Sequence, residues 1–283
     1  MYTENEIFQL QKIAVKMRRD LLEMVKPGKV GHLGGSASIM DIMAALYFKQ
    51  MNFNPNDIKN PERDIMILSK GHAALAQYAA LIELGIIDKS EMYKIKTLEG
   101  KLQGHPDMEK TPGIEAVTGS LGQGLSIAVG MALGLRLDKK DSTVYTICGD
   151  GELAEGQIWE AIMSAHMYEL SNLVAIVDHN RLQASDTTEK VMKIDKLKSK
   201  FEAFGWEVIE IDGHNMEQVL EALENAKKFK GGPTMIIAET VKGKGFSFAE
   251  NQVSFHNAHI DEKQYQQGIK DLDKQEETLN AVR

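Results

Sequence analysis

Asp150 and Asn180 each follow an apolar run that is typical of a buried β-strand, at 143–148 and 173–178. If the two strands are neighbours in a parallel sheet, their carboxyl ends meet at one edge, which is where such sheets bind ligands. A carboxylate and an amide oxygen are ligands that suit Mg²⁺, which also takes phosphate oxygens and water. The pair predicts a divalent-cation site, and the alternative is a plain Asp-Gly turn with an unrelated Asn.

The residues around Asp150 suit a phosphate ligand. Gly149 and Gly151 allow a tight turn, and the backbone N–H groups that open the following helix would face an anion. The chain has a formal net charge of −8, so glycines alone would not neutralise a diphosphate. We therefore expect Mg²⁺, or another divalent cation such as Ca²⁺, with the backbone carbonyl of Leu182 as a third protein ligand.

His32, His72 and His105 lie beside glycines, in loops or at strand ends, rather than on apolar helix faces. Imidazole can donate or accept a hydrogen bond and changes charge near neutral pH. A single histidine is most often structural, but three in Gly-rich turns favour a functional site. We interpret His166, His179 and His214 as structural, because the first is on a predicted helix, the second stands beside a predicted ligand and the third is in a turn.

The elements that must position these residues alternate between strands and helices. We expect strands at 65–68, 143–148, 173–178, 207–211 and 234–238, and helices at 7–25, 73–84, 125–137 and 216–230. A Gly-rich loop is expected at 28–35, a long irregular connection at 96–124, and a polar tail from about 261. The pattern predicts an α/β fold with a mostly parallel sheet between two helical layers.

The composition is that of an ordinary globular protein, with 43% hydrophobic and 26% charged residues. The acidic balance and the lack of a long Lys/Arg run argue against a nucleic-acid partner. No apolar stretch approaches the roughly 20 residues of a membrane helix. We expect one cytoplasmic domain over residues 1–283, with the single cysteine, Cys148, as a core residue.

Several motifs resemble those of transketolases, in the order in which that family carries them. They are Leu68-Ser69-Lys70-Gly71-His72, Gly104-His105-Pro106, Thr118-Gly119-Ser120-Leu121-Gly122-Gln123-Gly124, Gly149-Asp150-Gly151-Glu152-Leu153-Ala154-Glu155-Gly156, Asp178-His179-Asn180-Arg181-Leu182, Phe204-Gly205-Trp206 and Asp212-Gly213-His214. The resemblance covers roughly residues 8 to 260. It implies the three-layer α/β/α thiamine diphosphate-binding fold and thiamine diphosphate as the cofactor.

The resemblance also implies roles for individual residues. The implied catalytic histidines are His32, His72, His105 and His256, with His259 as the alternative to His256. The implied cofactor-binding residues are Lys70, His72, Gly119, Ser120, Leu121, Gly149, Asp150, Gly151, Glu152, Asn180, Lys242 and His256, with Asp150, Asn180 and Leu182 on the metal. For Lys70 and Lys242 the alternative is an ordinary solvated lysine, which we prefer for Lys244.

Three further positions depend on the same resemblance. Glu155 and Glu160 match glutamates at the subunit interface of the family, although a purely solvated role is the default for exposed acids. Ala184 stands where some relatives carry a Gln that approaches the thiazolium ring, so cofactor binding is expected to be retuned rather than lost.

The family also needs a second domain, whose glutamate shares a proton with the aminopyrimidine ring, and no region of this chain matches it. We therefore expect the N-terminal subunit of a split transketolase, active with a C-terminal subunit that carries the pyrimidine-binding domain, in an α2β2 assembly. Such an enzyme moves a two-carbon ketol unit from a ketose to an aldose, with sugars or sugar phosphates as substrates. The alternatives are the α subunit of a 2-oxo-acid dehydrogenase, a 1-deoxyxylulose-type synthase and a non-catalytic regulatory subunit.

Overall fold

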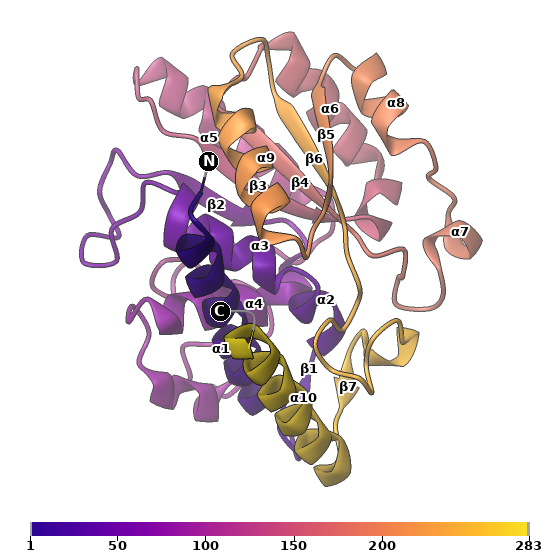
Figure 1. Cartoon of the computed structure of the whole chain (residues 1–283). Coiled ribbons are helices and arrows are strands. Elements are labelled where there is room, and N and C mark those ends of the chain that lie inside the picture. Colours follow the sequence, from indigo (N-terminus) through magenta and orange to yellow (C-terminus); the bar gives the residue numbers. More distant parts are fainter. Residues whose placement is uncertain (1, 282–283) are drawn as a thin grey trace.

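A five-stranded parallel sheet forms the centre of the molecule in the computed structural model, which describes residues 2–281 (Figure 1). The strands are β2 (Ile65–Leu68), β3 (Val144–Gly149), β4 (Leu173–His179), β5 (Glu207–Asp212) and β6 (Thr234–Glu239). Their order across the sheet is β2-β3-β4-β6-β5, with parallel pairing throughout. The predicted strands and the α/β class are confirmed.

Both faces of the sheet are covered, because alternate residues of each strand enter different hydrophobic cores. In β3, Tyr145 and Ile147 pack into one core while Val144 and Cys148 pack into the other. This two-residue alternation with apolar residues on both sides is typical of a parallel sheet between helical layers. The thiol of Cys148 is buried and its pKa is raised by that burial, which agrees with a core role.

The helices divide between the two faces. Residues of α1, α3, α4 and α9 belong to the first core, and residues of α5, α6 and α8 to the second. The α-helices are α1 (Glu4–Met24), α2 (Leu33–Ala37), α3 (Met40–Ala45), α4 (Ala74–Glu83), α5 (Gln123–Leu137), α6 (Gly156–Met167), α7 (Thr188–Val191), α8 (Leu197–Ala203), α9 (Met216–Lys228) and α10 (Glu262–Ala281). Helix α1 begins with a capping box formed by Thr3 and Glu6.

Short elements connect these helices and strands. A π-helical turn covers Leu46–Gln50, and 3₁₀ turns cover Gly71–Ala73, Lys89–Lys94, Gly151–Ala154 and Val253–Phe255. Strand β1 (Val30–Gly31) pairs antiparallel with β7 (Ala258–His259), which ties the C-terminal part of the chain to the segment just before His32. Within the described residues, no helix is both long and apolar enough to span a bilayer.

The structure corrects the prediction that 28–35 is entirely a loop. Gly34 and Gly35 belong to the short helix α2, where a Cβ at Gly34 would lie only 2.8 Å from the Phe255 carbonyl oxygen and 3.0 Å from Cγ of Lys242. Glycine therefore permits a close approach between distant segments here, rather than a flexible loop.

The polar segment after residue 261 forms helix α10, which lies beside α1 (Figure 1). Gly268 and Leu272 are its buried positions, and Arg19 of α1 makes ion pairs with Asp273 and Glu276. The sequence pattern predicts no element here, because only a narrow side of the helix is apolar.

Candidate active site

Asp150 and Asn180 lie at the same edge of the sheet, as their strand context predicts. In the β3–β4 pair, Gly149 is opposite Asp178, so Asp150 and Asn180 leave adjacent strands side by side. The Asp150 carboxylate accepts hydrogen bonds from the backbone N–H groups of Gly151, at 2.7 Å, and Arg181. Burial and the nearby charge of Asp178 raise the pKa of Asp150 to about 6. Among the described residues, no lysine, arginine or histidine forms an ion pair with this carboxylate, which suits it to a metal ion.

The Asn180 side chain has a fixed orientation. Its Nδ2 donates to Oδ2 of Asp178 at 2.7 Å, and its Oδ1 accepts from the backbone N–H of Leu182 at 3.1 Å. The amide oxygen therefore faces the Leu182 turn, on the side of the site where a metal ligand is expected.

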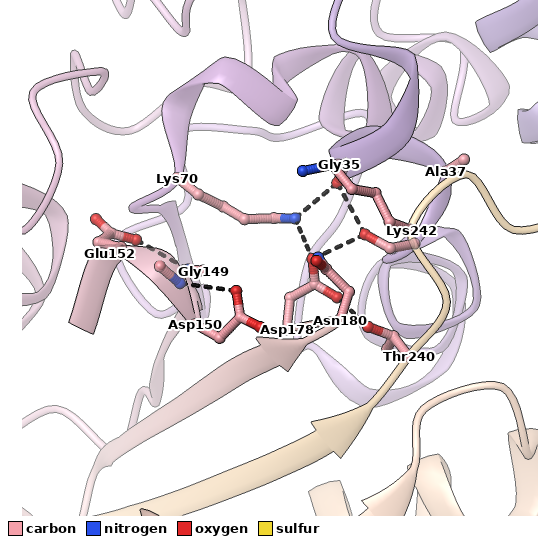
Figure 2. A network of polar contacts seen from close by, with 12 residues as sticks. Gly35, Ala37, Lys70, Gly149, Asp150, Glu152, Asp178, Asn180, Thr240 and Lys242 are labelled. Atoms are coloured by element: carbon pink, nitrogen blue, oxygen red, sulfur yellow. Dashed lines mark hydrogen bonds and ion pairs between the residues drawn. The ribbon is translucent and has the colours of Figure 1, made fainter. Parts of the chain in front are cut away.

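Asp178 organises the site, a role that sequence reasoning misses (Figure 2). Its buried carboxylate accepts hydrogen bonds from Lys70 at 2.5 Å, Ser38 at 2.8 Å, Asn180 and Thr240. Burial opposes ionisation, but the Lys70 ammonium and these hydrogen bonds outweigh it and hold the pKa of Asp178 below its ordinary value. A charged residue at the end of an otherwise apolar strand is the signal that could have revealed it.

Two buried lysines flank the strand ends. Nζ of Lys70 also donates to the Gly35 carbonyl oxygen at 2.6 Å. Nζ of Lys242 donates to the carbonyl oxygens of Leu182, at 2.9 Å, and Gln183, at 3.2 Å, and burial followed by the charge of Lys70 lowers its pKa to about 8. Both side chains are fully buried, so neither is an ordinary solvated lysine.

Glu152 joins three Gly-rich segments. Its carboxylate accepts from Oγ of Ser69 at 2.5 Å and from the backbone N–H groups of Gly122 at 2.7 Å and Gly149 at 3.0 Å. Burial raises its pKa. Because these donors occupy the carboxylate, Glu152 shapes the pocket by fixing the loops around it.

The four predicted histidines converge from distant parts of the chain. The ring of His32 has centroid distances of 5.2 Å to His72, 6.0 Å to His105 and 5.5 Å to His256, and His72 and His256 are 4.8 Å apart. His259 instead lies in β7, with Nδ1 3.2 Å from the Lys29 carbonyl oxygen. The structure thus brings His256, and not His259, into the cluster.

These imidazoles are held in the neutral form. Burial, with additional positive charge from nearby lysines, lowers the pKa of His32 to about 4 and that of His256 to about 3. The pKa of His72 falls further, to about 2, and that of His105 is also lowered. Neutral imidazole can donate from one nitrogen and accept at the other, so the cluster can bind hydroxyl groups at neutral pH.

The Gly119–Leu121 segment borders the histidines. A Cβ at Gly119, whose φ is 149°, would lie 2.8 Å from Cδ2 of His105. Of the predicted residues Gly119, Ser120 and Leu121, only Leu121 lines the pocket at the strand ends. Ser120 is exposed to solvent.

Glu155 and Glu160 lie outside this pocket. Both are exposed, Glu155 just before α6 and Glu160 within it. Met163 and Met167, which follow Glu160 at helical spacing, are also exposed, with 49% and 77% of their surface accessible. The outer side of α6 thus presents an apolar surface beside Glu160.

Of the three histidines interpreted as structural, His214 has the most defined contacts. Its Nδ1 is 2.8 Å from Oδ2 of Asp41, and its Nε2 accepts from the backbone N–H of Val241 at 2.9 Å. Arg18 completes this network with two hydrogen bonds to Asp41. The network fixes the backbone next to Lys242 and does not enter the pocket.

One pocket joins the strand ends to the histidines. Its lining residues are Gly35, Lys70, His72, Leu121, Gly149, Asp150, Gly151, Glu152, Asp178, Asn180, Leu182, Gln183, Ala184, Lys242 and His256. Three carboxylates face two lysines here, so a diphosphate would require a further cation. No cluster of three or more His, Cys, Asp or Glu side chains suited to a metal occurs in residues 2–281. A metal at this edge would therefore need amide, carbonyl and phosphate oxygens, which suits Mg²⁺.

Comparison with known proteins places the chain among thiamine diphosphate enzymes. The family described as "Transketolase, thiamine diphosphate binding domain" matches residues 10–278. The 6-deoxy-6-sulfo-D-fructose transketolase subunit SqwG of Clostridium sp. (strain MSTE9) is 43% identical, over 94% of this chain and 97% of its own length. An apulose-4-phosphate transketolase subunit of Phocaeicola vulgatus is 39% identical, over 97% of this chain and 96% of its own length.

A solved structure agrees with these relatives. The transketolase of Campylobacter jejuni superposes with a TM-score of 0.86 at 31% identity, over 96% of this chain. This chain spans only 43% of that protein, whereas it matches nearly the whole length of the Clostridium and Phocaeicola proteins.

Proposed function

The chain belongs to the transketolase family, as a subunit that carries the thiamine diphosphate-binding domain, and we propose that it transfers a two-carbon ketol unit from a ketose to an aldose together with a partner chain. The relatives of nearly equal length are themselves named as transketolase subunits, which supports the two-chain arrangement. Those two relatives are named for ketoses with a sulfonate or a phosphate group. We extend this to the substrate class and propose a ketose donor with a terminal anionic group.

The observation that carries this function is a pocket that joins two kinds of chemistry. At one end stand Asp150 and Asn180 with the flanking lysines, and at the other stand His72 and His256. A diphosphate-linked cofactor placed along this pocket would have its charged end at the strand ends and its reactive ring beside the imidazoles.

At the strand ends, we propose that Asp150, Asn180 and the Leu182 carbonyl oxygen hold Mg²⁺, or another divalent cation such as Ca²⁺. Lys242 donates to the Leu182 carbonyl, and we propose that the repulsion between the two cations makes it release this oxygen when a metal binds. The freed ammonium would then balance part of the remaining charge of the diphosphate, while Lys70 stays paired with Asp178.

The other residues of the site would bind and orient the cofactor and the sugar substrate. When bound, thiamine diphosphate supplies the carbon nucleophile that carries the two-carbon unit. The neutral His32, His72, His105 and His256 hold sugar hydroxyls and can move a proton between them. Leu121 would border the ring, with Gly119 packed against His105 beside it, and Gly149, Gly151 and Glu152 keep the phosphate end of the pocket in shape.

The proposed partner is a C-terminal transketolase subunit with the pyrimidine-binding domain, which would activate the cofactor ring. We place the contact on the outer side of α6, with Glu155 and Glu160, in an α2β2 assembly. We further propose that residues 1–283 act as one domain and that the enzyme works in the cytoplasm.

Reconstitution tests this function. The purified chain, the partner chain and their mixture would be assayed for two-carbon transfer from a ketose phosphate or sulfonate to an aldose, with thiamine diphosphate and Mg²⁺. We expect turnover from the mixture and negligible turnover from either chain alone. Asp150→Ala should abolish it, while the exposed control Glu189→Gln should not.

The same assay separates the alternatives. Oxidative decarboxylation of a 2-oxo acid without ketol transfer would indicate a 2-oxo-acid dehydrogenase subunit, which the family match already disfavours. Ketol transfer that persists with Asp150→Ala, or that the partner chain performs alone, would indicate a regulatory subunit instead.

A further inference from the structure

Gln183 lines the pocket, and its side-chain amide nitrogen is unpaired among the described residues. Its Nε2 is buried and has no hydrogen-bond partner among the described residues. The side chain lies against Gly151, because a Cβ at that glycine would be 2.7 Å from Cγ of Gln183 and 2.9 Å from its Cδ. The amide therefore stands beside the turn that carries Asp150.

The base of this side chain is fixed in place. The backbone N–H of Gln183 donates to the Asp186 carbonyl oxygen at 2.8 Å, and its own carbonyl oxygen accepts from Lys242 at 3.2 Å. A bridge between Leu182 and Thr187 closes the same turn. Gln183 is thus held beside Leu182, which is proposed to bind the metal, and Lys242, which is proposed to balance the charge of the diphosphate.

The lack of a partner is unusual within this pocket. Among its described lining residues, Gln183 is the only one with a buried side-chain polar atom that lacks a hydrogen bond. A buried amide without a partner costs free energy, and folded proteins rarely retain one unless a ligand or water satisfies it. The carboxylates of Asp150, Glu152 and Asp178 already accept from other donors.

We propose that the amide of Gln183 donates a hydrogen bond to a phosphate oxygen of the bound diphosphate. This rests on the proposed function, since it requires the diphosphate to occupy the pocket. A neutral donor adds no charge, so it complements the metal and the lysines by fixing the position of the phosphate rather than by neutralising it. The neighbouring Ala184 has no side-chain donor, so a side-chain contact from Gln183-Ala184 depends on Gln183 alone.

Calorimetry on the full chain with Mg²⁺ and inorganic pyrophosphate tests this contact. Gln183→Met keeps the length of the side chain but removes the donor, and it should weaken pyrophosphate binding about tenfold. Gln183→Glu should weaken it further, because a carboxylate would repel the phosphate. The exposed control Glu189→Gln should bind as the unmodified chain does.

Thermal unfolding without ligand separates this role from a structural one. Gln183→Met removes an unsatisfied buried group, so the unliganded variant should be at least as stable as the unmodified chain. Equal pyrophosphate affinity for Gln183→Met and the unmodified chain would overturn the proposal, as would a loss of unliganded stability in Gln183→Met that accounts for the weaker binding. If the unmodified chain showed no magnesium-dependent pyrophosphate binding, the proposed metal-diphosphate site would fail, and this proposal with it.

Discussion

The side-chain amide of Asn180 donates to the carboxylate of Asp178 at 2.7 Å, across the end of strand β4. The same carboxylate pairs with the buried ammonium of Lys70. One acid therefore sets the direction of a proposed metal ligand and neutralises a lysine beside the proposed diphosphate position. Asp178 therefore connects the proposed metal ligand Asn180 to the buried lysine Lys70.

Asp178→Asn should destabilise the fold as well as weaken cofactor binding. It leaves the Lys70 ammonium buried without its counter-charge, a loss that typically costs about 3–5 kcal/mol. It also lets the Asn180 amide rotate, since an amide can offer either its oxygen or its nitrogen. Chemical denaturation measures the first effect and calorimetry with Mg²⁺ and thiamine diphosphate the second. An Asp178→Asn variant as stable as the exposed control Glu189→Gln would contradict this role.

Lys242→Met should strengthen the binding of a metal ion in the absence of phosphate and weaken the binding of pyrophosphate. Without phosphate, the ammonium of Lys242 occupies the Leu182 carbonyl oxygen, so its removal should strengthen the binding of Mn²⁺ severalfold. With pyrophosphate present, the variant lacks a cation that balances the anion, and pyrophosphate should bind several times more weakly. Electron paramagnetic resonance with Mn²⁺ gives the first value and calorimetry with Mg²⁺ and pyrophosphate gives the second, and changes of the same sign would refute the exchange of partners.

Lys96→Met should raise the pKa of His32. Burial is the main cause of the lowered value, and the charge of Lys96 is the next. Removing that charge makes protonation easier, so an NMR titration of the imidazole should show a midpoint above about 4. An unchanged midpoint would show that Lys96 has no electrostatic contact with the cluster.

The same shift predicts how His32 affects stability. Its folded-state pKa of about 4 lies below the ordinary 6.5, so the unfolded chain binds more protons between these values. His32 therefore lowers the free energy of unfolding as the pH falls from 6.5 to 4. His32→Gln should lose less stability over this interval than the unmodified chain, as measured by denaturation at both ends of the window.

Met163→Glu should dissociate the partner chain. Met163 is exposed on α6, one helical turn from Glu160, and a carboxylate there would be buried in the proposed contact. Light scattering after size exclusion should show the two chains separating. The control Lys230→Glu changes an exposed residue just after α9, on the opposite face of the sheet, and should leave the assembly intact. An unaffected assembly in Met163→Glu would place the contact elsewhere.

The sequence was enough to predict those features of the site that depend on local sequence patterns. Asp150 and Asn180 follow apolar runs, and the parallel pairing of those runs dictates that their ends meet. His32, His72 and His105 stand beside glycines, which favoured a functional role, and the resemblance to transketolases implied that they act together with His256. The choice of His256 over His259 depended on how β7 pairs with β1, a contact between segments far apart in the chain.

The residues that sequence reasoning misses depend on long-range packing. The role of Asp178 appears only when Lys70, Ser38 and Thr240 come together from separate segments. Gln183 becomes notable only because its amide is buried against Gly151 without a partner among the described residues. Neither arrangement can be inferred from the spacing of residues in the sequence.

A crystal structure of the assembled enzyme with thiamine diphosphate and Ca²⁺ tests the proposed metal-diphosphate site most directly. We predict the cation about 2.4 Å from Oδ of Asp150, Oδ1 of Asn180 and the Leu182 carbonyl oxygen, with Lys242 withdrawn from that carbonyl. A cofactor bound with its cation away from Asp150 and Asn180 would contradict the assignment.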